Sequence, residues 1–166
     1  TSPALASNEA WKTPPIPQGW SHLEGTWDTG YVIKDSHGNE FVWVPVGAVN
    51  NVAGIATLKE YDWGKGLSAP SQVTYEPMPN QITNAIANTG GFYIARYEMS
   101  NNGGKAQSKK GISPWNNINW ANSKARSESM SSDYGWTGVY SHLLYDKEWD
   151  VTVKWLQNSG INVTDS

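Results

Sequence analysis

The side chains able to carry chemistry are few in this sequence, and their spacing does not assemble a recognisable catalytic site. Three histidines, His22, His37 and His142, lie far apart in unrelated contexts. Ser141 directly precedes His142, but the members of a nucleophile–base–acid triad meet in space rather than along the chain. The sequence contains no metalloprotease, calcium-loop or phosphate-loop pattern. It therefore predicts no catalytic residue and no metal site.

One charged pair stands out because of its spacing. Arg96 and Glu98 occupy alternate positions of an expected strand, so their side chains share one face. Such a pair suits a polar ligand site, and it equally suits an ion pair that holds a sheet together. We favour the structural interpretation.

Aromatic side chains offer a second kind of chemistry, namely stacking against a ligand. Four of them fall in expected loops, near the amides of Asn101 and Asn102: Trp63, Trp115, Tyr134 and Trp136. Exposed rings beside amides are used for sugar stacking and for protein hot spots. The alternative is that these rings cover the core beneath long loops. Four other tryptophans lie on expected helices and strands and are predicted to be core residues: Trp20, Trp43, Trp120 and Trp149.

The first half of the chain must supply the strands that position these residues. Residues 1–18 are predicted to form an extended arm, because prolines cluster at its end. Residues 19–166 are predicted to form a single domain. Within it, Glu40–Val46 alternates apolar side chains on both faces and follows a turn at Asp35–Asn39, which predicts a hairpin whose second strand is buried on both sides.

The second half is predicted to alternate short elements with loops. Residues 50–80 suggest a long excursion, and 81–88 a short helix with Asn80 as its N-cap and Ile82, Ala85 and Ile86 on one side. Residues 92–99 predict a strand and 101–111 a polar loop. Two main helices follow, at 120–132 with Asn119 as N-cap and at 146–157. The second carries a core-facing stripe of Tyr145, Trp149, Val153 and Leu156.

Composition narrows the class of protein. The 166 residues are 16% charged and 12% aromatic, with a formal net charge of −3 and no cysteine. Disulfides, thiolate metal sites and cysteine nucleophiles are therefore excluded. A general nucleic-acid binder needs a basic face, and a membrane span needs a long apolar run; neither is present. A weakly charged, amide-rich surface is typical of extracellular binding proteins.

Three blocks in fixed order resemble the formylglycine-generating enzyme (sulfatase-modifying factor) family. The first is Phe-Val-Trp-Val-Pro-Val at 41–46, and the second is Phe-Tyr-Ile-Ala-Arg-Tyr-Glu-Met-Ser-Asn at 92–101. The third combines Ile-Asn-Trp at 118–120 with His-Leu-Leu-Tyr-Asp-Lys-Glu-Trp-Asp at 142–150. The similarity spans Ile16 to Leu156 and is nearest to a divergent branch from phages and Gram-positive or gut bacteria.

The resemblance implies a C-type-lectin-like α+β fold, with two helices packed on small twisted antiparallel sheets and long loops. Catalytic members bind copper through two cysteines, so the absence of cysteine here excludes that oxidase chemistry. Glu148 matches a family helix position and is expected to tie down a neighbouring loop. We expect no cofactor. Because the family often has oxygen-ligand sites, calcium stays an open alternative.

The same resemblance bears on partners and function. The family's C-terminal Gly-Asn-Val-Trp-Glu-Trp block is missing, so the domain is expected to be incomplete at its C-terminus and to pair with a complementing polypeptide or a second copy. We expect a non-enzymatic module on the outside of a cell or virion that binds a protein or glycan receptor. The alternative is a structural subunit, such as a pilin head or a capsid or tail decoration protein.

Overall fold

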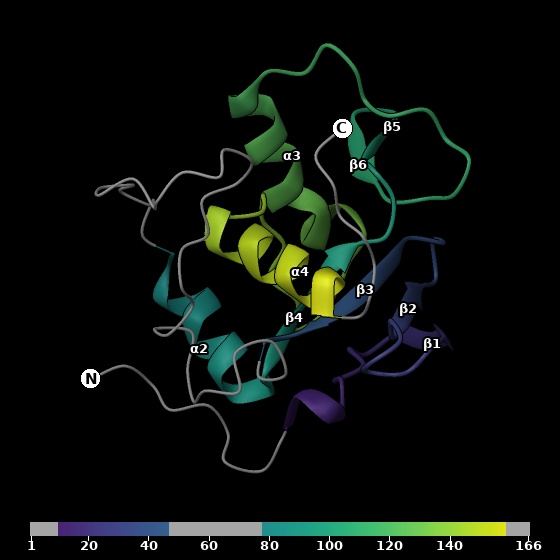
Figure 1. Cartoon of the computed structure of the whole chain (residues 1–166). Coiled ribbons are helices and arrows are strands. Elements are labelled where there is room, and N and C mark those ends of the chain that lie inside the picture. The colour runs from purple at the N-terminus through teal and green to yellow at the C-terminus, as the bar shows by residue number, and fades with distance from the viewer. Residues whose placement is uncertain (1–9, 47–77, 159–166) are drawn as a thin grey trace, which may run out of the picture. The chain divides into compact units, whose positions relative to one another are not determined.

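The computed structural model describes residues 10–46 and 78–158. These residues form an α+β architecture of three α-helices, a short 3-10 helix and two small sheets (Figure 1). In chain order the elements are η1 (Ala10–Lys12), β1 (Trp20–Glu24), β2 (Val32–Asp35), β3 (Glu40–Pro45), α2 (Asn80–Thr89), β4 (Gly91–Ala95), β5 (Ser100–Asn102), β6 (Lys105–Gln107), α3 (Trp120–Asp133) and α4 (Asp146–Asn158). The α+β class is confirmed, and the three α-helices correspond to the short helix and the two main helices that the sequence predicts.

The described residues divide into two compact units. One comprises residues 10–13, 44–46, 78–92 and 144–158, and so holds η1, α2 and α4. The other comprises residues 14–43 and 93–143, and holds β1, β2, the hairpin β5–β6 and α3. The boundaries of the predicted domain stay a prediction.

The larger sheet has the strand order β1-β2-β3-β4. β1 pairs antiparallel with β2, and β2 pairs antiparallel with β3, so the predicted hairpin around Asp35–Asn39 is confirmed. Trp43 and Val44, which point to opposite faces of β3, are 1% and 0% exposed. The prediction that this strand is buried on both sides therefore holds for its second half, while Phe41 and Val42 are half-buried.

The strand predicted at 92–99 is shorter in the structure. β4 ends at Ala95, and the chain bends at Arg96 and Tyr97. Arg96 and Glu98 therefore do not share a strand face, and Glu98 is exposed. At the bend, the hydroxyl of Ser108 accepts the backbone N–H of Tyr97 at 3.1 Å. This N–H therefore bonds a side chain instead of a neighbouring strand.

The predicted polar loop at 101–111 instead begins with a hairpin. β5 and β6 pair antiparallel and are joined by Gly103 and Gly104, whose φ angles are +60° and +88°. A two-residue turn with both φ angles positive matches the right-handed twist of a hairpin, and glycine adopts it without steric cost. The N–H of Gly104 also donates to the side-chain oxygen of Asn101 at 2.7 Å.

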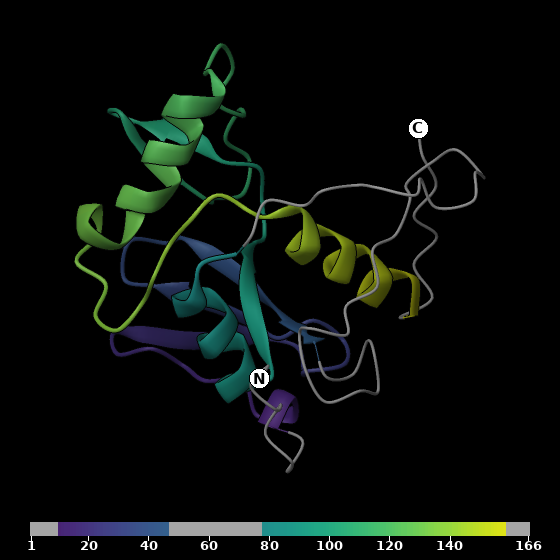
Figure 2. The ribbon, with the colours of Figure 1, turned by 90° about the vertical axis from the view of Figure 1, so that its left-hand side faces the viewer.

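α3 packs against β6, and both views show the helix beside the small hairpin (Figures 1 and 2). Asn119 is its N-cap as predicted, because its side-chain oxygen accepts the N–H of Asn122 at 2.9 Å. Only Ser127 and Met130 are buried on this helix. Trp120, predicted to be a core residue, is 63% exposed, because it is the first residue of the helix and lies beyond the buried face.

α4 buries only part of the face that its apolar residues predict, because Val153 is buried whereas Trp149 is exposed. Glu148, Val151, Thr152 and Trp155, spaced like one helical stripe, are all buried. Trp149, predicted to be core, is 51% exposed. The inward-facing residue at the start of α4 is Glu148, which is 1% exposed. Its carboxylate accepts the N–H of Tyr145, the residue preceding the helix, at 3.0 Å. A polar side chain can face inward here because it satisfies a free N–H of the helix start.

α2 confirms the predicted short helix but not its cap. The N-cap position is held by Pro79 without a side-chain hydrogen bond, so Asn80 is not the cap. The buried side chains are Ile82, Ile86 and Ala87, whereas Ala85 is exposed. None of the helices in the described ranges combines the length and the apolar character needed to cross a membrane.

α2 ends at Gly90, which adopts φ +79°. A Cβ built on Gly90 would lie 2.7 Å from the backbone nitrogen of Trp11. We expect Gly90→Ala to destabilise the protein in two ways, through the left-handed conformation, which costs an alanine about 1–2 kcal/mol, and through the overlap with Trp11. Urea unfolding followed by circular dichroism measures the total.

Gly111→Ala is the matched control for Gly90→Ala. Gly111 has φ +74°, but no atom lies within 4 Å of its added Cβ. Gly90→Ala should therefore cost at least about 1 kcal/mol more than Gly111→Ala, the cost of overpacking. Equal losses in the two variants would mean that the approach of Trp11 to Gly90 does not constrain the fold.

Candidate functional site

The aromatic cluster gathers on Trp136, in the loop after α3. The ring centroid of Trp136 lies 4.9 Å from that of Trp20, 5.8 Å from that of Phe41 and 5.6 Å from that of Tyr134. His37 adds a ring 5.2 Å from Tyr134. Tilted, edge-on and offset contacts at these distances are favourable, so the loop residue Trp136 joins β1, β3 and the end of α3 into one packed group.

A buried carboxylate fixes the position of Trp136. The side chain of Asp35 is 2% exposed, and its Oδ2 accepts the indole N–H of Trp136 and the amide of Asn39, each at 2.9 Å. Its Oδ1 accepts the backbone N–H groups of His37 and Asn39 at 2.9 and 2.7 Å. Aspartate begins such turns because its side chain bonds backbone N–H groups a few residues on. Four N–H donors therefore meet one carboxylate.

Asn39 connects this hydrogen-bonded turn to the segment that follows β6. Its side chain is fully buried, and its oxygen accepts the N–H of Ser108 at 3.0 Å. The hydroxyl of Ser108 in turn lies 2.9 Å from the carbonyl of Glu40, besides bonding Tyr97. The backbone N–H of Glu40 donates to the carbonyl of Ser108 at 2.9 Å. The turn after β2, the bend after β4 and the segment after β6 are thus joined through buried hydrogen bonds.

Arg96 makes ion pairs, but not with Glu98. Its guanidinium donates to the carboxylate of Glu40 at 2.9 Å and to that of Glu24. Burial acts to lower the pKa of Arg96, yet the hydrogen bonds that Arg96 donates to Glu40 and Glu24 raise this pKa overall. Arg96 therefore stays charged and ties the end of β1 to the start of β3, so its own charge is already paired with two carboxylates.

The predicted ligand-binding aromatics lie mostly within this packed group. Tyr134 is 8% exposed, Trp136 is half-buried, and Trp115 packs against the buried cluster of Ala106, Met130 and Tyr134. Trp63 lies outside the described residues. These rings contact one another and the small hairpin, which matches the alternative interpretation that they cover a core.

The amides predicted to accompany them lie elsewhere on the hairpin. Asn101 and Asn102 are both exposed on β5, and Asn101 already holds the turn through its bond to Gly104. Their part in ligand binding stays a prediction.

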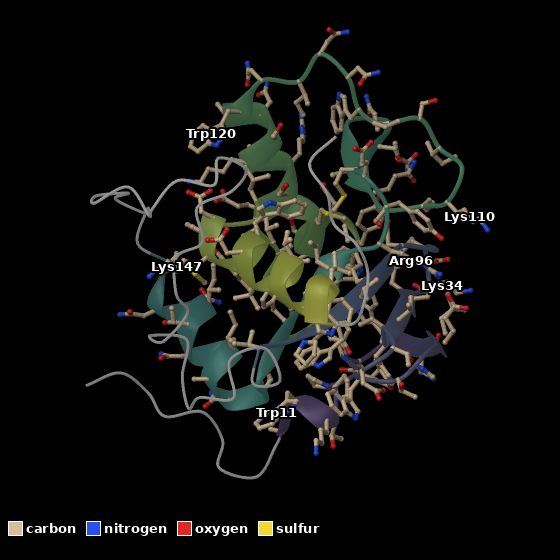
Figure 3. The ribbon with its side chains drawn as sticks, in the orientation of Figure 1. Trp11, Lys34, Arg96, Lys110, Trp120 and Lys147 are labelled. Atoms are coloured by element: carbon tan, nitrogen blue, oxygen red, sulfur yellow. The ribbon has the colours of Figure 1, made fainter. Side chains whose placement is uncertain are left out.

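The segment that follows β6 and ends in the first turn of α3 forms a surface that the sequence did not indicate as a site. We call Ile112–Ser123 the neutral strip, because these 12 residues include four asparagines and no charged side chain. Trp115 anchors it inward and donates its backbone N–H to the carbonyl of Met99 at 2.9 Å. At its other end Trp120 projects outward from α3 (Figure 3), and Ile112 is 48% exposed. The long uncharged run with repeated asparagine was the signal available in the sequence.

The titratable side chains do not assemble a catalytic site in the described part of the chain. His37 is the histidine nearest an acid, but Ser36 and Asp35 both approach its Nδ1, at 3.4 and 3.6 Å. A relay needs the two partners on different ring nitrogens. His22 stacks on Tyr31 and His142 on Tyr140. Among residues 10–46 and 78–158, no group of three or more His, Asp or Glu side chains could hold a metal ion.

Comparisons with models of protein families, with curated proteins and with solved structures find no match to this chain. Any functional inference must therefore start from the side chains themselves.

Asp35→Asn tests the carboxylate at the centre of the network. An amide has one acceptor oxygen, so in either orientation its NH₂ group would face two N–H donors of the four now bound. We expect the free energy of unfolding to fall by about 2–3 kcal/mol, the cost of leaving buried polar groups unsatisfied. Urea unfolding measures the loss, and the NMR signal of the Trp136 indole N–H should move.

Asp28→Asn provides the control for Asp35→Asn. Asp28 is exposed, and the hydroxyl of Thr26 donates to its carboxylate, a bond that lowers the pKa of Asp28. The hydroxyl can rotate to suit an amide oxygen, so the change should cost much less stability than Asp35→Asn. If both variants lose the same stability, the four-donor site at Asp35 is not what holds the loop of Trp136.

Proposed function

We propose that this chain is a non-enzymatic binding module that acts on the outside of a cell or virion and recognises a protein or glycan receptor. The neutral strip is the observation that supports it most directly. A tryptophan that is 63% exposed at the start of a capped helix is a rigid aromatic contact, and the strip around it is rich in amides. Rigid aromatic anchors beside adaptable hydrogen-bonding groups are the usual elements of a recognition surface.

The scaffold we propose is a C-type-lectin-like domain of the formylglycine-generating enzyme family, in a non-catalytic branch. The three sequence blocks that carry the resemblance fall on β3, on β4 with β5, and on the starts of α3 and α4. The α+β class is consistent with that scaffold. In this proposal the domain pairs with another polypeptide or with a second copy of the chain.

Binding of the full chain to intact cells tests the proposal. The fluorescently labelled protein is titrated onto a panel of bacterial and animal cells and measured by flow cytometry. We expect saturable binding to at least one cell type, and we expect Trp120→Ala to weaken it about tenfold, because burial of an indole in an interface contributes more than 1 kcal/mol.

Trp149→Ala is the control for this experiment, since it removes another half-exposed tryptophan, on α4. It should leave cell binding unchanged. Absence of saturable binding on every cell type, or equal binding by wild type and both variants, would refute the proposed function at this surface.

The structural-subunit alternative has its own supporting observation. Trp149 is 51% exposed on a helix whose other tryptophan, Trp155, is buried. A large exposed ring of this kind suits a contact between subunits. In that case the full chain should run as an oligomer in size-exclusion chromatography with light scattering, and Trp149→Ala should shift it toward the monomer. A monomer at high micromolar concentration, unchanged by Trp149→Ala, would argue against assembly through α4.

A further inference from the structure

The neutral strip lacks charged side chains, as does the longer run from Met78 to Ala95, and it differs from that run in presenting a largely exposed tryptophan. No charged residue occurs from Ile112 to Ser123, and the first turn of α3 contains no acidic residue. The nearest charge along α3, Lys124, lies 3.5 Å from Glu128 and is thereby paired. A surface without charged side chains offers no ion pair to phosphate, carboxylate or polybasic groups, so it suits an uncharged ligand.

The polar groups of the strip are available to such a ligand. The side chains of Asn116, Asn117 and Asn122 are exposed, and they form no hydrogen bond with the described residues. Each amide offers two N–H donors and one acceptor oxygen. A ligand rich in hydroxyl groups, which both donate and accept, can use all of these atoms.

Trp120 supplies the apolar contact that such a ligand needs. The ammonium of Lys124 lies 5.9 Å from the centroid of the indole of Trp120. The π face attracts groups that carry positive partial charge, as this contact shows. The C–H groups on one face of a sugar ring are such groups, and they are also apolar, so a sugar ring stacks on an indole while its hydroxyls point to the sides.

We propose that the neutral strip binds an uncharged saccharide, with Trp120 as the stacking platform and Asn116, Asn117 and Asn122 as hydrogen-bonding partners of its hydroxyl groups. The inference rests on the proposed function and narrows its receptor to a neutral glycan. Trp115 takes a positioning role, because it holds the strip through its bond to Met99 and its packing beneath the loop.

The test is a titration of the ¹⁵N-labelled full chain with three uncharged trisaccharides, namely the β1,4-linked N-acetylglucosamine trimer, cellotriose and maltotriose. A hyaluronan tetrasaccharide serves as the charged counterpart. Trp120→Phe assigns the indole N–H signal of Trp120. With at least one uncharged sugar we expect this signal and the amide signals of Asn116, Asn117 and Asn122 to shift saturably, while the indole signal of Trp149 stays in place.

Two variants separate the platform from the amides. Trp120→Ala should weaken the sugar about tenfold or more, and its exposed position means that the melting temperature should hold. Asn117 has φ +60°, a conformation that glycine adopts freely, so Asn117→Gly removes the amide without backbone strain. It should weaken the sugar roughly three- to tenfold, as expected for one or two hydrogen bonds. Asn88→Ala, which removes an exposed amide on α2, should have no effect.

The outcomes distinguish this inference from the proposed function. If cell binding depends on Trp120 and is destroyed by periodate but not by protease, and the sugar shifts appear, the inference holds. If cell binding depends on Trp120 but is destroyed by protease and no uncharged sugar moves the Trp120 signal, the partner is a protein; the saccharide inference fails while the proposed function stands. If neither cells nor sugars respond to Trp120→Ala, both fail.

Discussion

The carboxylate of Asp35 is the interaction on which the larger part of this structure depends. It accepts four N–H groups, two from its own turn, one from the side chain of Asn39 and one from Trp136. Only a carboxylate offers acceptors on both oxygens, which explains why aspartate occupies this position. Trp136 is thereby placed to pack on Trp20, Phe41 and Tyr134, and Asn39 is turned toward Ser108. One buried charge, fully hydrogen-bonded, orders both the aromatic cluster and the junction of three segments.

The features that the sequence predicts correctly depend on near neighbours along the chain. The double-faced apolar alternation at Trp43 and Val44 predicts a buried strand, and Asn119 is recognisable as a cap because its bond reaches only three residues on. The features that it misses depend on distant partners. Nothing close to Arg96 in sequence shows that its carboxylates are Glu24 and Glu40. Glu148, whose resemblance-based role is to tie down a neighbouring loop, has a near partner by contrast, because it accepts the N–H of Tyr145, the residue just before α4.

The tryptophans of the candidate site also show that the sequence alone does not reveal which side chains are buried. The prediction that tryptophans on helices and strands are core residues fails for Trp120, while the loop residue Trp136 packs against the buried cluster, which is one of the two interpretations that the sequence leaves open. Membership in a helix does not say which face is buried, and Trp120 occupies the end of its helix, where little protein lies beside it. Within five residues the chain turns one tryptophan inward, at Trp115, and one outward, at Trp120. The rigid interior of the loop and its exposed face are thus parts of one short segment.

The buried bonds of Asp35 and Asn39 also have a consequence for synthesis of the chain. The indole that bonds Asp35 lies 101 residues further on, and the backbone N–H that bonds Asn39 lies 69 residues further on. At ribosomal rates the wait for Trp136 is roughly 5–20 s. Until Tyr93 is made, β3 lacks the ring that packs on Trp43, and until Trp136 is made the hairpin lacks the indole donor of the network. The nascent hairpin therefore carries partly uncovered apolar side chains until those partners are made, and exposed apolar surface of this kind favours aggregation during synthesis.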